Sequence, residues 1–140
     1  MKRIILFLAF VLPVMMINAQ EVVGTWKTID DETGEAKSYV QIYEVKGKLY
    51  GKITKLLKES QDKLCTECTG KDKDKPIVGL TILKNLSKDG EEYGGGTIMD
   101  PNNGKVYKCY ITLEDKDKLK VRGYIGFSLI GRTQYWYRVN

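Results

Sequence analysis

The chain has 140 residues, a formal net charge of +5 and no histidine. A chain of this length predicts one domain with a modest hydrophobic core. The absence of histidine excludes Ser-His-Asp and Cys-His catalytic sites, imidazole-bound zinc and histidine proton shuttles. No carboxylate pair stands out as an acid and a base, so no enzymatic activity is predicted.

The N-terminal segment has the pattern of a secretory signal peptide. Two basic residues precede an apolar run over residues 4–17, and Ala19 supplies a small residue at the expected cleavage point. At about 1.5 Å per residue the run reaches about 21 Å, less than the roughly 30 Å hydrocarbon core of a bilayer. We therefore predict cleavage in preference to membrane anchoring. The expected products are a signal peptide at 1–19 and one mature domain at 20–140, exported to the periplasm or the medium.

Charged residues in the mature chain alternate in sign. Residues 71–75 and 115–118 mix lysine with aspartate, as solvated loops do. Neither segment forms the continuous basic stripe that binds nucleic acid. Nucleic acid is therefore not an expected partner.

Turn-forming sequences recur at short intervals between stretches rich in Val, Ile, Leu, Tyr and Thr. Apolar and polar residues alternate within several of these stretches, as in half-buried strands. We predict an all-β fold, an eight-stranded antiparallel up-and-down β-barrel. The strands are expected near residues 22–30, 36–45, 48–57, 77–86, 92–99, 105–114, 118–126 and 131–139.

Three segments depart from the strand pattern. Residues 52–64 are expected to form one or two helical turns in their C-terminal part. Residues 65–76 are the one long irregular stretch and predict a loop at one mouth of the barrel, where function often lies. The glycine cluster at 94–96 predicts a β-bulge or close strand packing in preference to a phosphate-binding loop.

The two ends of the mature chain carry complementary residues. Trp26 lies on the first predicted strand and Arg138 on the last, with Arg132 as a second arginine candidate. A closed sheet brings its first and last strands together, so a guanidinium can cover the indole at the barrel floor. We expect Trp26 and Arg138 to form this floor pair.

Several blocks along the mature chain, in this order, resemble the bacterial domain-of-unknown-function family numbered 2147. The Gly-x-Trp start and the late arginine are also similar to those of the calycin group, which includes the lipocalins. The resemblance implies an eight-stranded barrel with an internal ligand site, and it carries no activity. The blocks are Gly24-Thr25-Trp26, residues 31–34, residues 47–53, Cys65-Thr66-Glu67-Cys68, residues 73–77, residues 95–101, residues 121–124 and Arg132-Thr133-Gln134.

The last predicted strand has two faces that both carry large rings. Arg132, Gln134, Trp136 and Arg138 share one face, which we expect to point inward and offer polar groups to a ligand. The alternative is that this face only packs against the core, because an eight-stranded barrel can also be filled by its own side chains.

The three cysteines support several interpretations. A structural disulfide is favoured in an exported protein, either between Cys65 and Cys68 or from one of them to Cys109. Thiol-disulfide catalysis and a three-thiolate metal site are the alternatives. Cys109 alone also fits a small buried core position. No metal site and no cofactor are predicted.

These observations lead to three hypotheses about function. The first is non-enzymatic binding of a small apolar or lipid-like ligand inside the barrel. The second is an envelope protein-interaction module with a filled barrel, in which the loop at 65–76 and exposed tyrosines contact a protein partner. The third is a redox or metal-binding protein built on Cys65 and Cys68.

Overall fold

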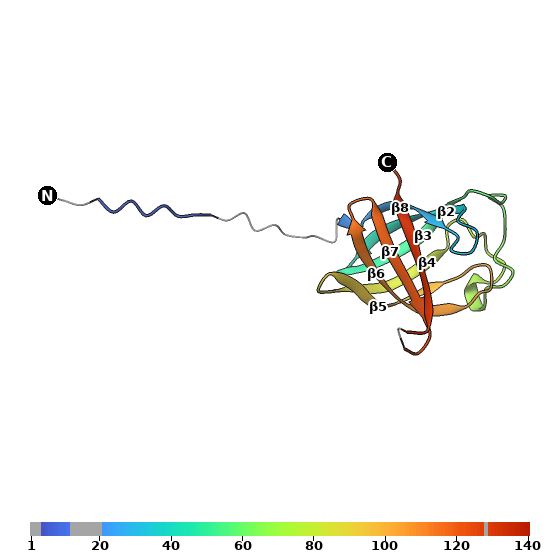
Figure 1. The fold of residues 1–140 in the computed structure, drawn as a ribbon. Coiled ribbons are helices and arrows are strands. Elements are labelled where there is room, and N and C mark those ends of the chain that lie inside the picture. Colours follow the sequence, from blue (N-terminus) through green and yellow to red (C-terminus); the bar gives the residue numbers. More distant parts are fainter. Residues whose placement is uncertain (1–3, 12–20, 128) are drawn as a thin grey trace.

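The computed structural model describes residues 4–11, 21–127 and 129–140. Eight strands, each antiparallel to the next, form a closed barrel in which the last strand returns to the first (Figure 1). The predicted all-β, eight-stranded up-and-down barrel is confirmed. The strands are β1 (Gly24–Ile29), β2 (Ala36–Val45), β3 (Lys48–Leu56), β4 (Thr81–Asp89), β5 (Glu92–Met99), β6 (Val106–Asp115), β7 (Lys118–Tyr124) and β8 (Gly131–Arg138).

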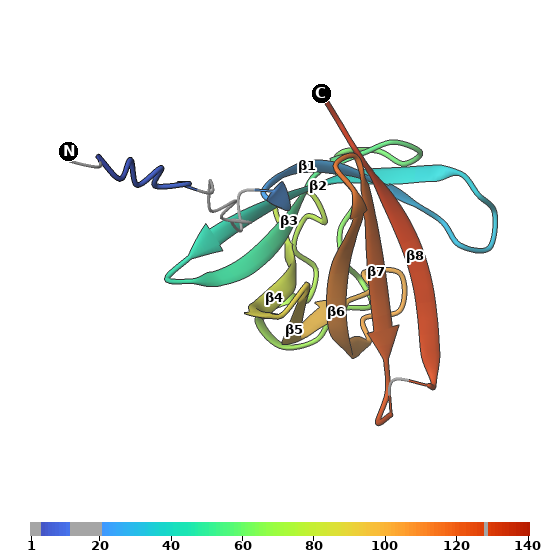
Figure 2. The same cartoon turned by 60° about the vertical axis from the view of Figure 1, so that its left-hand side comes forward.

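The core of the barrel lies within residues 22–136. All buried apolar side chains described fall in this range, and residues 4–11 are exposed and lie outside the barrel in both views (Figures 1 and 2). The barrel therefore does not need residues 4–11 for its packing. The predicted cleavage point after Ala19 lies outside the described residues.

Alternation decides which side chains face inward. In β7, Leu119 and Val121 are buried, whereas the flanking Lys118 and Lys120 are partly exposed. Successive side chains of a strand point to opposite faces, so the aliphatic residues fill the interior and the lysines cover the outside. The same pattern recurs in β1 and β2.

The fourth strand differs from its predicted bounds, 77–86. Ile77 belongs instead to the preceding loop, where its N–H donates to the Lys63 carbonyl at 2.9 Å. Gly79 follows with φ +102°, a conformation that interrupts an extended strand. β4 therefore begins at Thr81, and it continues to Asp89, which pairs with Glu92 across the next turn.

The predicted helical turns within 52–64 are wrong. β3 extends to Leu56, and the side chain of Gln61 then takes the place of a neighbouring strand. The Leu56 N–H donates to Gln61 Oε1 at 3.0 Å, and Gln61 Nε2 donates to the Leu56 carbonyl at 2.6 Å. These bonds satisfy the backbone of Leu56 without a helix. The helix described nearby is a short 3₁₀ turn, η2 (Gly70–Asp72).

The glycine cluster forms a bulge with close strand packing, as predicted. The register between β5 and β6 shifts between Tyr93 and Gly96, and Gly95 has φ +73°. A Cβ on Gly96 would lie 2.1 Å from the Lys84 carbonyl oxygen of β4. Only glycine therefore allows the two strands to approach this closely.

One end of the barrel is closed by Trp26 and Arg138. Trp26 is fully buried, and its indole N–H donates to the Val22 carbonyl at 2.9 Å. The guanidinium carbon of Arg138 lies 4.4 Å from the centre of the Trp26 ring, and Arg138 Nε donates to the Lys116 carbonyl at 2.8 Å. Trp26 and Arg138 are also partners in the register of β1 and β8. We call this the closed end.

Candidate functional site

The other end of the barrel leads into an internal cavity of about 570 Å³. All eight strands contribute to its wall, together with the turns β1–β2, β3–β4, β5–β6 and β7–β8. In an up-and-down barrel these four turns lie at the same end, opposite the closed end. We call this end the mouth. The volume lies within the range of about 300–1,000 Å³ that is typical of small-molecule sites.

One part of the cavity wall is apolar. Its residues come from β3, β4, β5 and β7 and from the loop before β4. Burial of a ligand against such a wall is favourable by about 25 cal/mol per Å² of apolar surface. The apolar residues are Ile53, Leu56, Ile77, Ile82, Ile98, Met99 and Val121.

A polar chain crosses the gap between β8 and the β1–β2 turn. Trp136 is buried, and its indole N–H donates to Gln134 Oε1 at 3.2 Å. Gln134 Nε2 donates in turn to Asp31 Oδ1 at 3.4 Å. Because the amide accepts at one side and donates at the other, its orientation in the cavity wall is fixed.

Arg132 lies at the rim of the mouth. Its Nε donates to Asp31 Oδ2 at 2.7 Å and its Nη2 to Glu32 Oε1 at 3.1 Å. The hydrogen bond that Arg132 donates to Asp31 is the main cause of a raised pKa for the guanidinium. The Arg132 side chain is nevertheless 57% exposed, so these ion pairs are largely solvated. Arg132 is therefore a charged, solvent-exposed residue at the rim of the cavity.

Asp30 shapes the same rim. Its Oδ1 accepts the backbone N–H groups of Glu32 at 2.8 Å and Thr33 at 3.2 Å, which closes the β1–β2 turn. The Glu32 N–H is the main cause of a lowered pKa for this carboxyl group, and Lys37, 3.7 Å away, adds to the effect. The main role of the Asp30 carboxylate is thus to stabilise the β1–β2 turn.

A hydroxyl pair inside the cavity was missed by the sequence analysis. Thr28 Oγ1 and Ser38 Oγ are 2.7 Å apart, and both residues are buried. The sequence could have indicated that Thr28 faces inward, because it lies two residues after the inward-facing Trp26 on the same strand. Among the described residues, no buried side-chain nitrogen or oxygen lacks a hydrogen-bond partner. The cavity therefore contains polar groups that are already satisfied.

The four candidate ligand residues of β8 divide into two groups. Arg132, Gln134 and Trp136 line the cavity together. Arg138 covers Trp26 at the closed end and does not belong to the described cavity lining. Arg138 is therefore not carried forward as a ligand residue.

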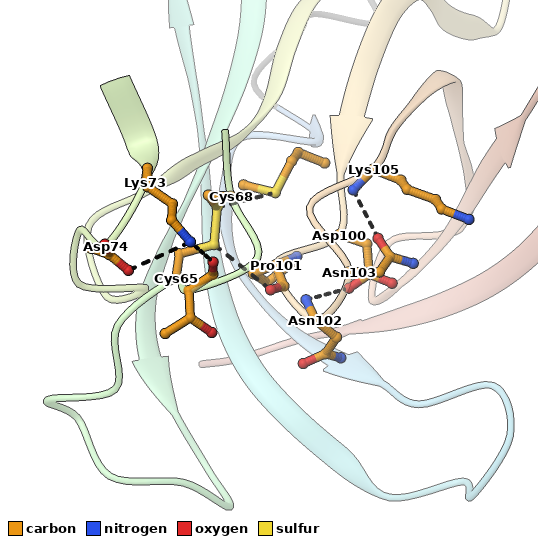
Figure 3. Close-up of a disulfide and its surroundings, with 11 residues drawn as sticks. Cys65, Cys68, Lys73, Asp74, Asp100, Pro101, Asn102, Asn103 and Lys105 are labelled. Atoms are coloured by element: carbon orange, nitrogen blue, oxygen red, sulfur yellow. Dashed lines mark hydrogen bonds and ion pairs between the residues drawn. A yellow bond between two sulfur atoms is a disulfide. The ribbon is translucent and has the colours of Figure 1, made fainter. Parts of the chain in front are cut away.

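The disulfide joins Cys65 and Cys68, which is one of the pairings that the sequence left open. Both cysteines are buried beside the β5–β6 turn, where Cys65 Sγ lies 3.7 Å from the Pro101 carbonyl oxygen (Figure 3). Cys68 Sγ lies 3.9 Å from the sulfur of Met99, which lines the cavity. The disulfide thus fixes the 65–76 loop against one side of the mouth.

Cys109 is a buried free thiol, as one of the interpretations held. Burial raises its pKa to about 12. A nucleophilic or metal-binding cysteine is a thiolate, so this environment does not favour either role. With two of the three sulfurs bonded to each other, a three-thiolate site cannot form in this structure. In the described ranges, no group of three or more Cys, Asp or Glu side chains is placed to hold a metal ion.

The sequence profile of a family described as "uncharacterized protein conserved in bacteria (DUF2147)" matches residues 24–138. The chain belongs to this DUF2147 family. A search of curated proteins found no match. The matched region contains the whole barrel, so the DUF2147 domain here is the eight-stranded barrel itself.

A solved structure supports the same fold. It is described as "Protein HP1028 from the human pathogen Helicobacter pylori belongs to the lipocalin family". The alignment has a TM-score of 0.75 and 21% identity, and it covers 84% of this chain and 82% of that chain. At this identity the likeness shows the fold alone. The DUF2147 chain thus has a lipocalin-like barrel. In the part of the chain that the structure describes, no helix has the length and hydrophobicity needed to cross a bilayer.

Proposed function

We propose that the barrel binds a small, largely apolar or lipid-like molecule without chemical conversion. The observation that carries the proposal is the cavity of about 570 Å³, open at the mouth and lined by aliphatic side chains over much of its wall. Among the described residues, the buried side-chain nitrogen and oxygen atoms already have hydrogen-bond partners, so an incoming molecule does not need to supply them. Binding is then driven mainly by removal of apolar surface from water.

The polar side of the cavity orients the ligand. Gln134 and Trp136 lie deeper along β8, and Arg132 lies at the rim. A ligand with one polar end would place that end at the rim, beside Arg132 and solvent, and its apolar part against Ile53, Ile82 and Ile98. This orientation avoids burial of an unpaired polar group.

The direct test is a titration with cis-parinaric acid, a fluorescent fatty acid. A Gly123→Leu variant reduces the cavity, because Gly123 lines it and a Cβ there would lie 3.4 Å from Ile98 Cγ2, an ordinary contact. We expect saturable binding to the wild-type chain. Each buried methylene contributes about 0.8 kcal/mol, so loss of room for two methylenes weakens binding about tenfold.

The matched control is Gly94→Leu. Gly94 is also a strand glycine, but a Cβ there would meet the Cβ of Tyr110 on the outer face at 3.5 Å. This variant should bind the probe as the wild-type chain does. Equal loss in both variants, or no binding by the wild-type chain, would refute the proposed function.

We infer further that the protein acts after export. The disulfide between Cys65 and Cys68 is compatible with an oxidising compartment, and the pattern at residues 1–19 is that of a signal peptide. The mass of the protein recovered from a periplasmic fraction tests this inference. A chain beginning at Gln20 supports it, and a chain that retains the first residues in the cytoplasm contradicts it.

A further inference from the structure

The turn between β7 and β8 exposes four large apolar side chains. The exposed fractions are 61% for Ile125, 77% for Phe127, 90% for Leu129 and 64% for Ile130. We call these four residues the apolar tip. The turn projects beyond its neighbours at the mouth, away from the C-terminus (Figures 1 and 2). Single exposed apolar residues are normal on a protein surface, whereas a cluster at a projecting turn marks an interaction site.

The apolar tip is continuous with the cavity. Ile125 and Ile130 also line the cavity, so one apolar surface runs from the interior to Phe127 and Leu129. Backbone hydrogen bonds hold the turn, from the Ile125 N–H to the Ile130 carbonyl and from the Ile130 N–H to the Phe127 carbonyl, both at 3.0 Å. Backbone hydrogen bonds therefore hold the turn, while the side chains of Phe127 and Leu129 remain largely exposed.

The strands behind the tip are basic. Residues 118–140 contain five lysines and arginines and no acidic residue. Arg132 and Arg138 are engaged at the rim and the closed end. The outer face of β7 carries Lys118, Lys120 and Arg122, which alternate with buried aliphatic residues. On this side of the barrel the surface is therefore complementary to an anionic partner, whereas the β1–β2 turn on another side of the mouth is acidic, with Asp30, Asp31 and Glu32.

Tyrosines lie between these cations. Lys118 Nζ is 4.6 Å from the centre of the Tyr135 ring, and Lys120 Nζ is 5.8 Å from that of Tyr110. Tyr124, directly before the tip, contacts Tyr110 at 6.2 Å between ring centres. Apolar side chains flanked by tyrosine and lysine are typical of segments that lie at a membrane interface.

We propose that the apolar tip inserts into the surface of an anionic lipid bilayer and holds the β7–β8 side of the mouth against it. Phe127 and Leu129 enter the acyl region, while Lys120 and Arg122, the cations of β7 nearer to the tip, contact the headgroups. Docking itself is independent of the proposed function. Its purpose rests on that function, since the continuous apolar surface would let a lipid-like ligand pass between bilayer and cavity.

Co-sedimentation with lipid vesicles tests the proposal. The protein is the chain of residues 21–140, which holds all eight strands and the described core. We expect it to bind vesicles of phosphatidylcholine and phosphatidylglycerol, and to bind pure phosphatidylcholine more weakly. The double variant Phe127→Ser, Leu129→Ser removes two apolar side chains from the bilayer. We therefore expect its binding to vesicles to be weaker by a factor of about ten or more.

Val45→Ser is the matched control, because Val45 is an exposed apolar residue at the β2–β3 turn of the closed end. It should bind vesicles as the wild-type chain does. In addition, Phe127→Trp should give a blue-shifted emission on binding that brominated lipids quench. Equal binding by the wild-type and double-variant chains, or no binding by the wild-type chain, overturns the proposal. If the wild-type chain does not bind vesicles, a protein would become the expected partner of the apolar tip.

The same samples separate this proposal from the proposed function. Binding of cis-parinaric acid without vesicles reports on the cavity alone. If the probe binds in solution and vesicles do not bind, the docking proposal fails and the proposed function stands. If vesicles bind through the tip and the probe does not enter the cavity, docking stands and the proposed function fails.

Discussion

The closed end and the mouth of this barrel use the same residue types for different purposes. At the closed end, Arg138 covers Trp26 and donates to backbone carbonyls, and its side chain is only 20% exposed. At the mouth, Arg132 pairs with carboxylates while 57% of its side chain remains exposed, and Trp136 borders a cavity. The closed end is filled by packed side chains, and the mouth leads into the cavity.

The role of an arginine or tryptophan in this barrel depends on its position along the barrel axis. Arg132 and Arg138 share one face of β8, six residues apart, which corresponds to about 20 Å at 3.3 Å per residue. Their surroundings differ accordingly. Substitutions at the closed end should therefore affect folding, and those at the mouth should affect binding.

The largest expected effect is that of Trp26→Ala. Removal of this buried ring should lower the free energy of unfolding by about 4 kcal/mol, as is typical of large-to-small changes in a core. Denaturant unfolding measures the loss. Trp26→Phe, which keeps a ring, should lose less and provides a folded variant for comparison. A loss below about 1 kcal/mol for Trp26→Ala would contradict the role of Trp26 in closing the barrel.

The two arginines provide the sharpest comparison. Arg138→Gln removes the guanidinium above Trp26 and its hydrogen bonds to the Lys116 and Val23 carbonyls. We expect a loss of about 3 kcal/mol in the free energy of unfolding. Arg132→Gln should cost less than about 1 kcal/mol, since its ion pairs are solvated. Equal losses would remove the distinction between the two ends.

The disulfide should have an intermediate effect. It closes a short loop, with a sequence separation of 3, so the entropic gain is about 2 kcal/mol. The Cys65→Ser, Cys68→Ser variant should lose about this amount in denaturant unfolding. Probe binding should weaken as well, because Met99 next to Cys68 lines the cavity. A variant as stable as the wild-type chain would show that the loop is held by its other contacts.

The smallest effect at neutral pH is expected at Cys109. The thiol should not react with iodoacetamide at pH 8 in the folded chain, and it should react after unfolding. Burial raises its folded pKa to about 12 from an ordinary 9.0, so its contribution to stability is constant below pH 9 and falls as the pH rises toward 12. In the Cys109→Ala variant, the free energy of unfolding should therefore fall less between pH 9 and pH 12 than in the wild-type chain. Rapid alkylation of the folded chain would contradict its burial.

Much of the architecture could be predicted from the sequence. Alternation and turn residues predict the strand order, and Trp26 with Arg138 at the two ends indicates closure. The bounds of β4 could not be predicted, because Ile77 is apolar enough for a strand and is held in a loop by a distant carbonyl. The conformation of residues 52–64 could not be predicted either, because it depends on hydrogen bonds between the Gln61 side chain and the backbone of Leu56.

The site was less predictable than the fold. Alternation along β8 groups Arg132 with Arg138 on one face, but it does not give their depth in the barrel. Whether the interior is hollow depends on the summed volumes of side chains from all eight strands. Of the apolar tip, Ile125 fell within the predicted strand at 118–126, and the other three residues fell in the connection to the last predicted strand. Their exposure could not be predicted, because it depends on where β7 ends.

If the proposed function is right, a ligand binds in the cavity at the mouth and leaves the closed end unchanged. The chain has two tryptophans, one at each end, so an ¹⁵N-labelled sample gives one indole N–H signal for each. A titration with lauric acid, followed by NMR, tests the claim in the wild-type protein. We expect the Trp136 signal to shift with saturation while the Trp26 signal stays in place. A shift of the Trp26 signal alone, or of neither, would contradict it.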